Sequence, residues 1–477
     1  MNTYRRTPAA AAAILAAAAG TVLLGGCATF SRDAGFGDVE SVARERLDKK
    51  INWIRSEADA TNVRTAVMDL LRTELSVDDA VQIALLNNPG LQAAYAELGI
   101  AEADLVQAGR MSNPHLSYLR TRDGGERKFE WALTFPIIDL LTLPLRRKIE
   151  GRRFEAAKLG VAARVVEVAA ESRRAYFRAV AAEELVRYVE QVKTASEASA
   201  ELARGMARAG NWSRLSEMRE QAFHAEVVAR LARARHAALG ERERLVRLMG
   251  LAQGDARFTL AARLPELPAG DPEYKDLEAK AMAQRLDIQM AKRETESLAE
   301  SLGLTKATRF VNVFELGPAG TKEDPEPWKR GFEVSLQVPI FDWGEARVAR
   351  AETTYMQSAR RLAESAVNAH SELREAHSAY RAAREAAMLY RDEVVPLRKK
   401  ISEENLLRYN GMLVSVFDLL ADAREQIAAV TGYIEALRDF WLAETDLRAA
   451  VNGPSPARRT DPFNAARGVV RAQAGGH

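Results

Sequence analysis

The chain has 477 residues, of which 47% are hydrophobic and 28% are charged, so it is long enough for a large ordered structure of about two to four domains. Its 68 basic and 66 acidic residues leave a formal net charge of only +2. This balance argues against a dedicated nucleic-acid-binding protein, which would carry a basic face or tail.

The N-terminus has the pattern of a bacterial secretion signal. The positive pair Arg5 and Arg6 precedes an apolar run from 9 to 24, and small residues then lead to Cys27. This resembles a lipoprotein cleavage site, at which residues 1–26 are removed and Cys27 is lipidated with acyl chains such as palmitate. Cys27 is the only cysteine, so it cannot form an internal disulfide. An uncleaved membrane helix is the alternative, but the apolar run is shorter than the roughly 20 residues that a span needs.

No later segment reaches 18 consecutive apolar residues, so we expect no membrane-spanning helix in the mature chain. Any further contact with hydrocarbon would have to come from strands. Residues 27–75 are expected to form an N-terminal segment that precedes the first repeated unit.

The first repeated unit is predicted over residues 76–263. Ser76 is a predicted helix N-cap, and the helix continues to about Met111, before Asn113-Pro114. Two strands, about 115–121 and 129–136, flank the turn Asp123-Gly124-Gly125. In the second strand apolar side chains alternate with polar ones, which predicts one apolar and one polar face.

A long helix follows the first pair of strands. From 145 to about 208 the chain has no proline, which allows roughly 95 Å of helix at 1.5 Å per residue. It then turns at Gly210 and returns as a second helix. Helices of this length are typical of a coiled-coil rod or tube.

A linker, 264–274, leads to the second repeated unit, over residues 275–453, which has the same order of elements as the first. Its strands are expected at about 309–316 and 331–338, with a polar loop between them. Its long helix is interrupted only by Pro396, which should kink it, and it turns at Gly411. Residues 454–477 are expected to be a disordered C-terminal tail.

Short motifs recur at a nearly constant offset between the two units. Pro136-Ile137-Ile138-Asp139 matches Pro339-Ile340-Phe341-Asp342 at an offset of 203, and Gly210 matches Gly411 at 201. A drifting but persistent offset indicates two copies of one structural unit with loops of different length.

Four strands cannot close into a barrel, and open edges cannot face hydrocarbon because each unpaired N–H or C=O there costs several kcal/mol. Either the hairpins pack on protein in water, or several chains pool their strands in one barrel. Three chains would supply twelve strands, within the range of known membrane barrels. The alternation of side chains by itself leaves both interpretations open.

Four segments carry a resemblance to a known family. They are LSVDDAVQIALLNNPGLQAA from 75, QAGRMSNPHLSY from 107, VPIFDWGEARVARAE from 338 and LLRYNGMLVSVFDLLADARE from 406. Their order and duplication resemble the TolC family of outer-membrane efflux proteins over about 75–453.

The resemblance implies a mainly α fold with a membrane β-barrel. Duplicated long helical hairpins would form a trimeric α-barrel, and four β-strands per chain would complete a 12-stranded transmembrane β-barrel. The N-terminal, inter-repeat and C-terminal segments would form an equatorial belt. The two Pro-Ile-x-Asp motifs would mark the places where the chain leaves the barrel and enters the tube.

The implied function is a passive exit duct in a tripartite efflux system, not an enzyme. The implied partners are two further copies of the chain, a periplasmic adaptor (membrane fusion) protein, an inner-membrane pump and outer-membrane lipid, with no nucleic acid. The implied location is the outer membrane of a Gram-negative bacterium, with the lipid-anchored chain extending into the periplasm. The alternative function is a periplasmic coiled-coil scaffold lipoprotein without a membrane barrel.

Site residues follow from the resemblance as well. The two helical turns, with Gly210 and Ser213 in one and Gly411 and Ser415 in the other, are candidate adaptor contacts. Asp418, with Asp422 one helical turn later, is the candidate gate, where three copies of a carboxylate would repel one another and attract cations. A solvated helix start that favours an acidic residue is an equally good interpretation of Asp418.

No other cluster of residues predicts a site. His370 and His377 are seven residues apart on one helical face, but no further ligand completes a metal site. The chain has no phosphate-binding glycine loop, nucleophile elbow or HExxH motif, so no catalytic group, cofactor or metal is expected. The cargo, whether metal, drug, solvent or protein, and the class of the pump stay open.

Overall fold

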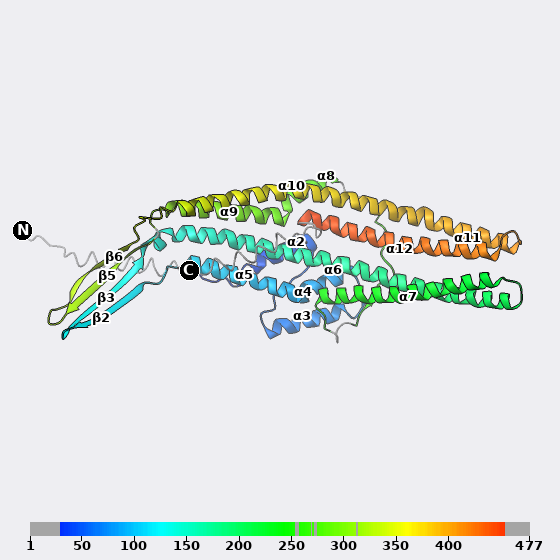
Figure 1. Cartoon of the computed structure of the whole chain (residues 1–477), viewed down its shortest axis with the longest axis horizontal. Coiled ribbons are helices and arrows are strands. Elements are labelled where there is room, and N and C mark those ends of the chain that lie inside the picture. The colour runs from blue at the N-terminus through cyan, green and yellow to red at the C-terminus, as the bar shows by residue number, and fades with distance from the viewer. Residues whose placement is uncertain (1–28, 253–256, 269, 271–273, 312, 454–477) are drawn as a thin grey trace, which may run out of the picture. The chain divides into compact units, whose positions relative to one another are not determined.

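The computed structural model describes residues 29–252, 257–268, 270, 274–311 and 313–453 (Figure 1). The described chain is mainly helical and divides into two compact units. The first unit combines residues up to 37 with 96–160 and 289–365, and the second combines 38–95 with 161–288 and the chain from 366 onward. The predicted signal peptide, Cys27 and the C-terminal tail lie outside the described residues.

The first unit contains a four-stranded antiparallel sheet with the order β2-β3-β5-β6 (Figure 1). The strands are β2 (His115–Asp123), β3 (Glu126–Pro136), β5 (Phe314–Glu323) and β6 (Lys329–Leu336). The first hairpin lies where alternation predicts it, the second is displaced in its first strand, and the two join edge to edge in one sheet. The second hairpin is the sequence counterpart of the first, so the sheet is itself a product of the duplication.

Strand β5 differs from the sequence prediction. It begins at Phe314, whereas the prediction placed this strand at 309–316 and a polar loop after it. Glycines explain the shift: a Cβ on Gly317 would overlap the carbonyl of Leu133, and a Cβ on Gly320 would lie 2.5 Å from the indole Nε1 of Trp131. Close approach of β3 thus requires residues that strand propensity disfavours.

The helix predicted from 76 to about 111 is divided in two. Helix α4 (Val77–Asn87) and helix α5 (Pro89–Ala108) meet at Asn88, which has an extended backbone conformation because a proline follows it. Ser76 is the N-cap of α4, as predicted, and its side chain forms a reciprocal capping box with Asp79.

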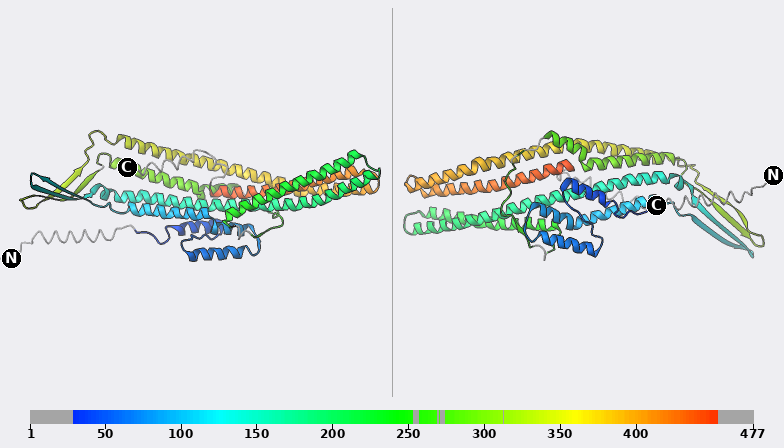
Figure 2. Two further views of the ribbon diagram at one scale, coloured as in Figure 1. Left: turned by 60° about the horizontal axis from the view of Figure 1, so that its bottom comes forward. Right: turned by 180° about the vertical axis from the view of Figure 1, so that it is seen from behind.

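Each copy continues as a long helical hairpin. The elements of the first copy are α6 (Ile137–Arg208) and α7 (Arg214–Met249), and those of the second are α10 (Glu345–Leu389), η1 (Tyr390–Val394), α11 (Val395–Asn410) and α12 (Val416–Asn452). Helix α6 is unbroken through 72 residues, with Pro144 in its third turn (Figure 2). The expected perturbation at Pro396 takes the form of the π-helical turn η1, which ends just before that proline. The ring of Tyr390 in this turn lies against Gly432 of α12, where a Cβ would be only 2.7 Å from it.

The largest buried core lies in the second unit. Helix α3 (Glu57–Leu70) packs against α4 there, and the same core includes residues from the middle of α6, from α12 and from a short parallel pair formed by β1 (Glu74–Leu75) and β4 (Thr259–Leu260). Its buried members come from segments far apart in the chain and include Val67, Leu75, Phe177, Leu245, Leu264 and Leu437. The short helix α2 (Phe36–Leu47) precedes α3. The N-terminal and inter-repeat residues therefore share one core with both repeats.

Both copies also use the same kind of helix junction. Helices α8 (Tyr274–Gln284) and α9 (Leu286–Ala307) meet at Arg285, the counterpart of Asn88 between α4 and α5. The Asn88 amide donates to the carbonyl of Leu248 at the end of α7 (2.8 Å), and the Arg285 guanidinium donates to the carbonyl of Ala450 near the end of α12 (3.3 Å). In each copy a polar side chain at the break satisfies a terminal carbonyl of the returning helix.

Candidate functional site

One face of the sheet is apolar across all four strands. The pairs that share this face include Leu116–Leu133, Tyr118–Trp131, Leu316–Val334 and Pro318–Phe332. Several of these side chains are exposed, with Phe332 the most exposed at 83%. The predicted alternation is confirmed. The exposed apolar side chains are contiguous over several strands, as at a contact with a partner or a membrane, and the charged Arg120, Lys322 and Arg330 lie on the same face nearer the hairpin turns.

The opposite face of the sheet is polar. Glu315 accepts a hydrogen bond from the Thr134 hydroxyl (2.9 Å) and lies 3.3 Å from Nδ1 of His115. Lys128 forms ion pairs with Glu130 and with Glu323 of the neighbouring strand. The charged groups are thus linked across β2, β3 and β5 on the side away from the apolar face.

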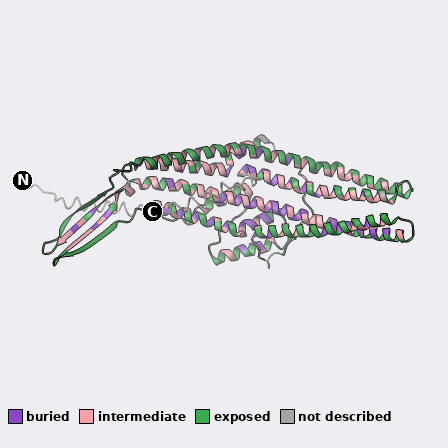
Figure 3. Ribbon diagram, viewed as in Figure 1, coloured by how far each residue is buried: buried purple, intermediate pink, exposed green. Residues whose placement is uncertain are grey.

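The two outer strands have open edges. Within the part of the chain that the structure describes, β2 pairs only with β3, and β6 pairs only with β5. Both outer strands are exposed along their described lengths (Figure 3). A sheet with an apolar face and two open edges is incomplete by itself, because each edge carries a row of unpaired backbone donors and acceptors.

The two helical turns have the same geometry, displaced by one residue from the sequence match. Gly210 has a left-handed backbone (φ 75°) after α6, and in the second turn the left-handed residue is Met412 (φ 59°), not Gly411. Counted from these residues, Ser213 and Ser415 are equivalent N-caps of α7 and α12. Ser415 and Asp418 stand one residue further from Gly411 than Ser213 and Ser216 stand from Gly210, because α11 ends one residue later than the match of the two glycines implies.

The two candidate gate residues lie in different surroundings. The exposed carboxylate of Asp418 accepts hydrogen bonds from the hydroxyl and the backbone N–H of Ser415, and these bonds, the hydroxyl first, lower its pKa. Asp422 is only 7% exposed, and its Oδ2 atom has no hydrogen-bond partner among the described residues. The structure does not bring the two carboxylates together in one hydrogen-bonded network.

A buried ion pair near the second turn was not predicted. Glu220 of α7 is 4% exposed, and its Oε1 lies 2.8 Å from the Arg424 guanidinium of α12. Ser199 of α6 donates to the other oxygen (3.0 Å), and the ring of Phe223 lies 4.3 Å from the guanidinium carbon. The partners are 204 residues apart, so periodicity along the chain gives no signal for this contact.

The histidines do not form a metal site in the described chain. His370 pairs with Glu278 (3.0 Å) and is half exposed. No group of three or more histidine, cysteine or acidic residues among the described residues could hold a metal ion.

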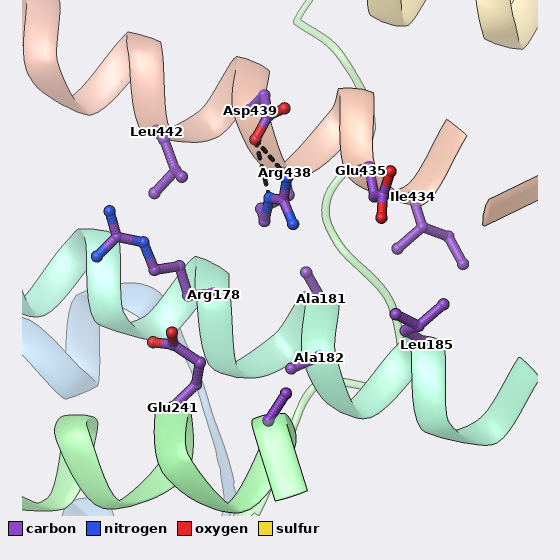
Figure 4. Close-up of a pocket in the computed structure, with 11 residues that line it drawn as sticks. Arg178, Ala181, Ala182, Leu185, Glu241, Ile434, Glu435, Arg438, Asp439 and Leu442 are labelled. Atoms are coloured by element: carbon purple, nitrogen blue, oxygen red, sulfur yellow. Dashed lines mark hydrogen bonds and ion pairs between the residues drawn. The ribbon is translucent and has the colours of Figure 1, made fainter. Parts of the chain in front are cut away.

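A cavity of about 360 Å³ lies between α6, α7 and α12 in the second unit (Figure 4). Its wall is mostly apolar, with Ala181, Leu185 and Ile434 on facing helices. The charged groups at its margin include Arg438 and Asp439, which pair with each other (2.8 Å).

No helix among the described residues is both long enough and apolar enough to cross a membrane.

The fold is shared with solved outer-membrane channels. A membrane protein from Pseudomonas aeruginosa matches with a TM-score of 0.68 and 18% identity over 79% of this chain and 93% of that chain. The Campylobacter jejuni CmeC outer-membrane channel matches at 0.67 and 17% identity over 79% and 85%, and the outer-membrane channel OprN at 0.66 and 17% over 85% and 94%. No protein-family model matches the sequence, and no curated protein matches it significantly. The predicted fold, that of the TolC-family channels, is confirmed.

Proposed function

We propose that this chain is the outer-membrane channel of a tripartite efflux system, a member of the TolC family that acts as a passive trimeric duct. The observation that carries the proposal is the sheet, which has one apolar face, one polar face and two open edges. The shared fold with solved outer-membrane channels supports it.

Closure of the sheet needs other copies of the chain. In hydrocarbon each unpaired backbone group costs several kcal/mol, so strands β2 and β6 cannot remain open there. Three copies, with β2 of each paired to β6 of the next, give a barrel of twelve strands and no edge. The apolar face then meets lipid, and the face with Glu315 and Lys128 meets water in the lumen.

The long helices continue the duct into the periplasm. Helix α6 alone spans about 108 Å at 1.5 Å per residue. The turns at Gly210–Ser213 and Gly411–Ser415 are the proposed contacts for a periplasmic adaptor, which joins the duct to an inner-membrane pump. Lipidation of Cys27 would anchor each chain to the outer membrane of a Gram-negative bacterium.

Asp418 and Asp422 are the proposed gate. Asp418 is exposed, and hydrogen bonds from Ser415 lower the pKa of its carboxyl group further below neutral pH, so three ionised copies around an axis would attract cations. Asp422 adds a carboxylate with one oxygen unpartnered in the described chain.

Asp418→Ser removes the charge but keeps a residue that is compatible with the helix start, because Ser216 occupies the equivalent position in the first turn. In planar bilayers Asp418→Ser and Asp422→Asn should each reduce cation selectivity or ease opening. Ser216→Asp is the matched control for an added charge at the other turn. Unchanged conductance and selectivity in both aspartate variants would remove the gate assignment and leave Asp418 as a helix cap.

The function itself is tested by the state of the purified lipoprotein. We expect a detergent-stable trimer that migrates on a gel in a heat-modifiable way and conducts ions in a planar bilayer. A stable monomer that shows no heat-modifiable migration and conducts no ions would instead favour a periplasmic scaffold lipoprotein.

A further inference from the structure

We propose that the second exit from the sheet, residues 338–343, inserts into the headgroup layer of a phospholipid leaflet and anchors the channel there. The inference rests on the proposed function, because it needs the sheet to lie in a membrane. It adds a membrane-surface contact outside the strands, at one of the two Pro-Ile-x-Asp motifs.

The two motifs are duplicated in sequence but differ in structure. After Pro136 the chain enters α6 at once, so Ile137 and Ile138 are half-buried on a helix. After Pro339 no helix begins until Glu345. The second motif therefore presents its apolar side chains outward, with exposures of 66% for Ile340, 98% for Phe341 and 55% for Trp343.

The loop at the second exit from the sheet is held in place by specific contacts. The Arg309 guanidinium donates to the carbonyl of Trp343 (2.9 Å), and the ring of Phe310 packs edge-on against the Trp343 indole (6.4 Å between centroids). Gly344 has a left-handed backbone (φ 74°), and its N–H donates to the Asp342 carboxylate (2.8 Å). A Cβ on Gly344 would lie 2.8 Å from the carbonyl of Arg309. These contacts fix the loop at its base and leave Phe341 at its tip.

Two features indicate that the loop contacts a phospholipid leaflet: it continues the apolar face of the sheet, and it has the residue types found at membrane surfaces. The apolar face of β6, with Phe332 and Val334, continues through the exposed side chain of Val338 into the loop without a polar break on that face. Tryptophan at the boundary of a lipid-facing apolar band is typical of membrane–water interfaces. Exposed Arg350 follows the loop on α10 and can contact lipid phosphates, whereas Arg347 donates to the carbonyl of Arg309 (3.3 Å) and lies 3.9 Å from the Asp342 carboxylate.

Tryptophan quenching by brominated phosphatidylcholine tests the contact. The chain has six tryptophans, so three single-tryptophan variants retain Trp343, Trp131 or Trp441, with the other five replaced by phenylalanine. The full-length protein is reconstituted in vesicles whose bromine atoms lie either near the headgroups or deep in the acyl chains. We expect Trp343 to be quenched most by shallow bromine, Trp131 of the apolar sheet face most by deep bromine, and Trp441 of the helical core by neither.

The outcomes separate the inference from the function. Quenching of Trp131 without quenching of Trp343 would overturn the inference, because the loop would then face water or a neighbouring subunit while the sheet lies in lipid. Absence of quenching at both positions would contradict the proposed function itself. A single change in the native background repeats the test: Trp343→Phe should remove part of the shallow quenching, and Trp441→Phe should remove none.

A variant of the loop tip completes the test. Phe341→Ser should reduce the shallow quenching of Trp343 and shift its emission to longer wavelength, with the heat-modifiable trimer retained. Leu239→Ser, at an exposed leucine of α7, is the matched control and should change neither. Equal spectra for Phe341→Ser and Leu239→Ser would count against insertion of the loop.

Discussion

Arg285 offers the sharpest test of how the second copy is held together. Its side chain is 1% exposed, and its guanidinium bonds the carboxylates of Asp287 (2.8 Å) and Glu372 (2.8 Å) and the carbonyl of Ala450. Burial opposes the charge, but the bonds to the two carboxylates outweigh it and raise the pKa of Arg285. The arginine therefore ties α8, α9, α10 and α12 through one charged centre.

Arg285→Met removes the charge and keeps much of the apolar volume. The change removes the buried bonds of Arg285 to two poorly exposed carboxylates, a loss of about 3–5 kcal/mol, and its bond to the Ala450 carbonyl, about 1 kcal/mol more. At about 2–4 °C per kcal/mol for a large domain, the melting temperature should fall by on the order of 10 °C.

Thermal unfolding followed by far-UV circular dichroism, at fixed protein and detergent concentration, measures this loss. Arg293→Met is the control, because Arg293 is 41% exposed and pairs with Glu296 within one helix, so about 0.5 kcal/mol or less is at stake. If the melting temperature of Arg285→Met stays within about 1 °C of that of the control, the buried network does not stabilise the fold and the reasoning fails.

Three further changes test separate features. Met412→Gly should stabilise the second helical turn by about 0.5–1 kcal/mol, because a left-handed backbone disfavours any side chain and the side chain of Met412, 93% exposed, makes little compensating contact. Backbone amides at the start of α12 should then exchange more slowly with deuterium, and faster exchange would contradict the prediction. Gly317→Ala should abolish the heat-modifiable trimer, because the new Cβ would overlap the β3 backbone. Gly331→Ala on β6 should preserve the trimer, because the space around Gly331 is open. If both variants gave the same amount of trimer on a gel, the close contact of Gly317 with β3 would be refuted. Glu184→Gln should raise the melting temperature at pH 7 but not at pH 4, because burial raises the pKa of Glu184 in the folded protein. The contribution of Glu184 to folding stability is therefore present below its ordinary pKa of 4.5 and is lost as the pH rises through the folded pKa, whereas glutamine stays neutral at both pH values. A gain of the same size at both pH values would rule out this explanation.

Local chemistry made much of the fold predictable. The alternation in Phe129–Phe135 gives the period of a two-faced strand, and Ser76 with Asp79 gives a capping box. The duplication adds information that one copy lacks, because the second hairpin has weaker signals than the first and gains support from its counterpart. The long helices follow from the absence of proline between 145 and 208.

The errors have a common physical cause, which is that contacts distant in sequence override local preference. Strand β5 contains Gly317, Pro318 and Gly320, which propensity assigns to a loop, but they allow close approach to β3. The helix junction at Arg285 and the ion pair of Glu220 with Arg424 depend on partners 87 to 204 residues away. Aligning Gly210 with Gly411 placed the second turn one residue too early, because backbone conformation does not show in the sequence. In the structure Met412, not Gly411, has the left-handed backbone that Gly210 has in the first turn.

The proposed duct requires the open edges β2 and β6 of neighbouring chains to pair and close one barrel. Cysteine at Ser117 of β2 can be combined with cysteine at Gly331, Glu333 or Ser335 of β6, positions that share the polar face. Within one chain these edges are three strand spacings apart, about 14 Å, too far for a disulfide, so any bond formed joins two chains. We predict that oxidation of at least one pair gives a covalent ring of three chains on a denaturing gel, and only monomers for all three pairs would contradict the account.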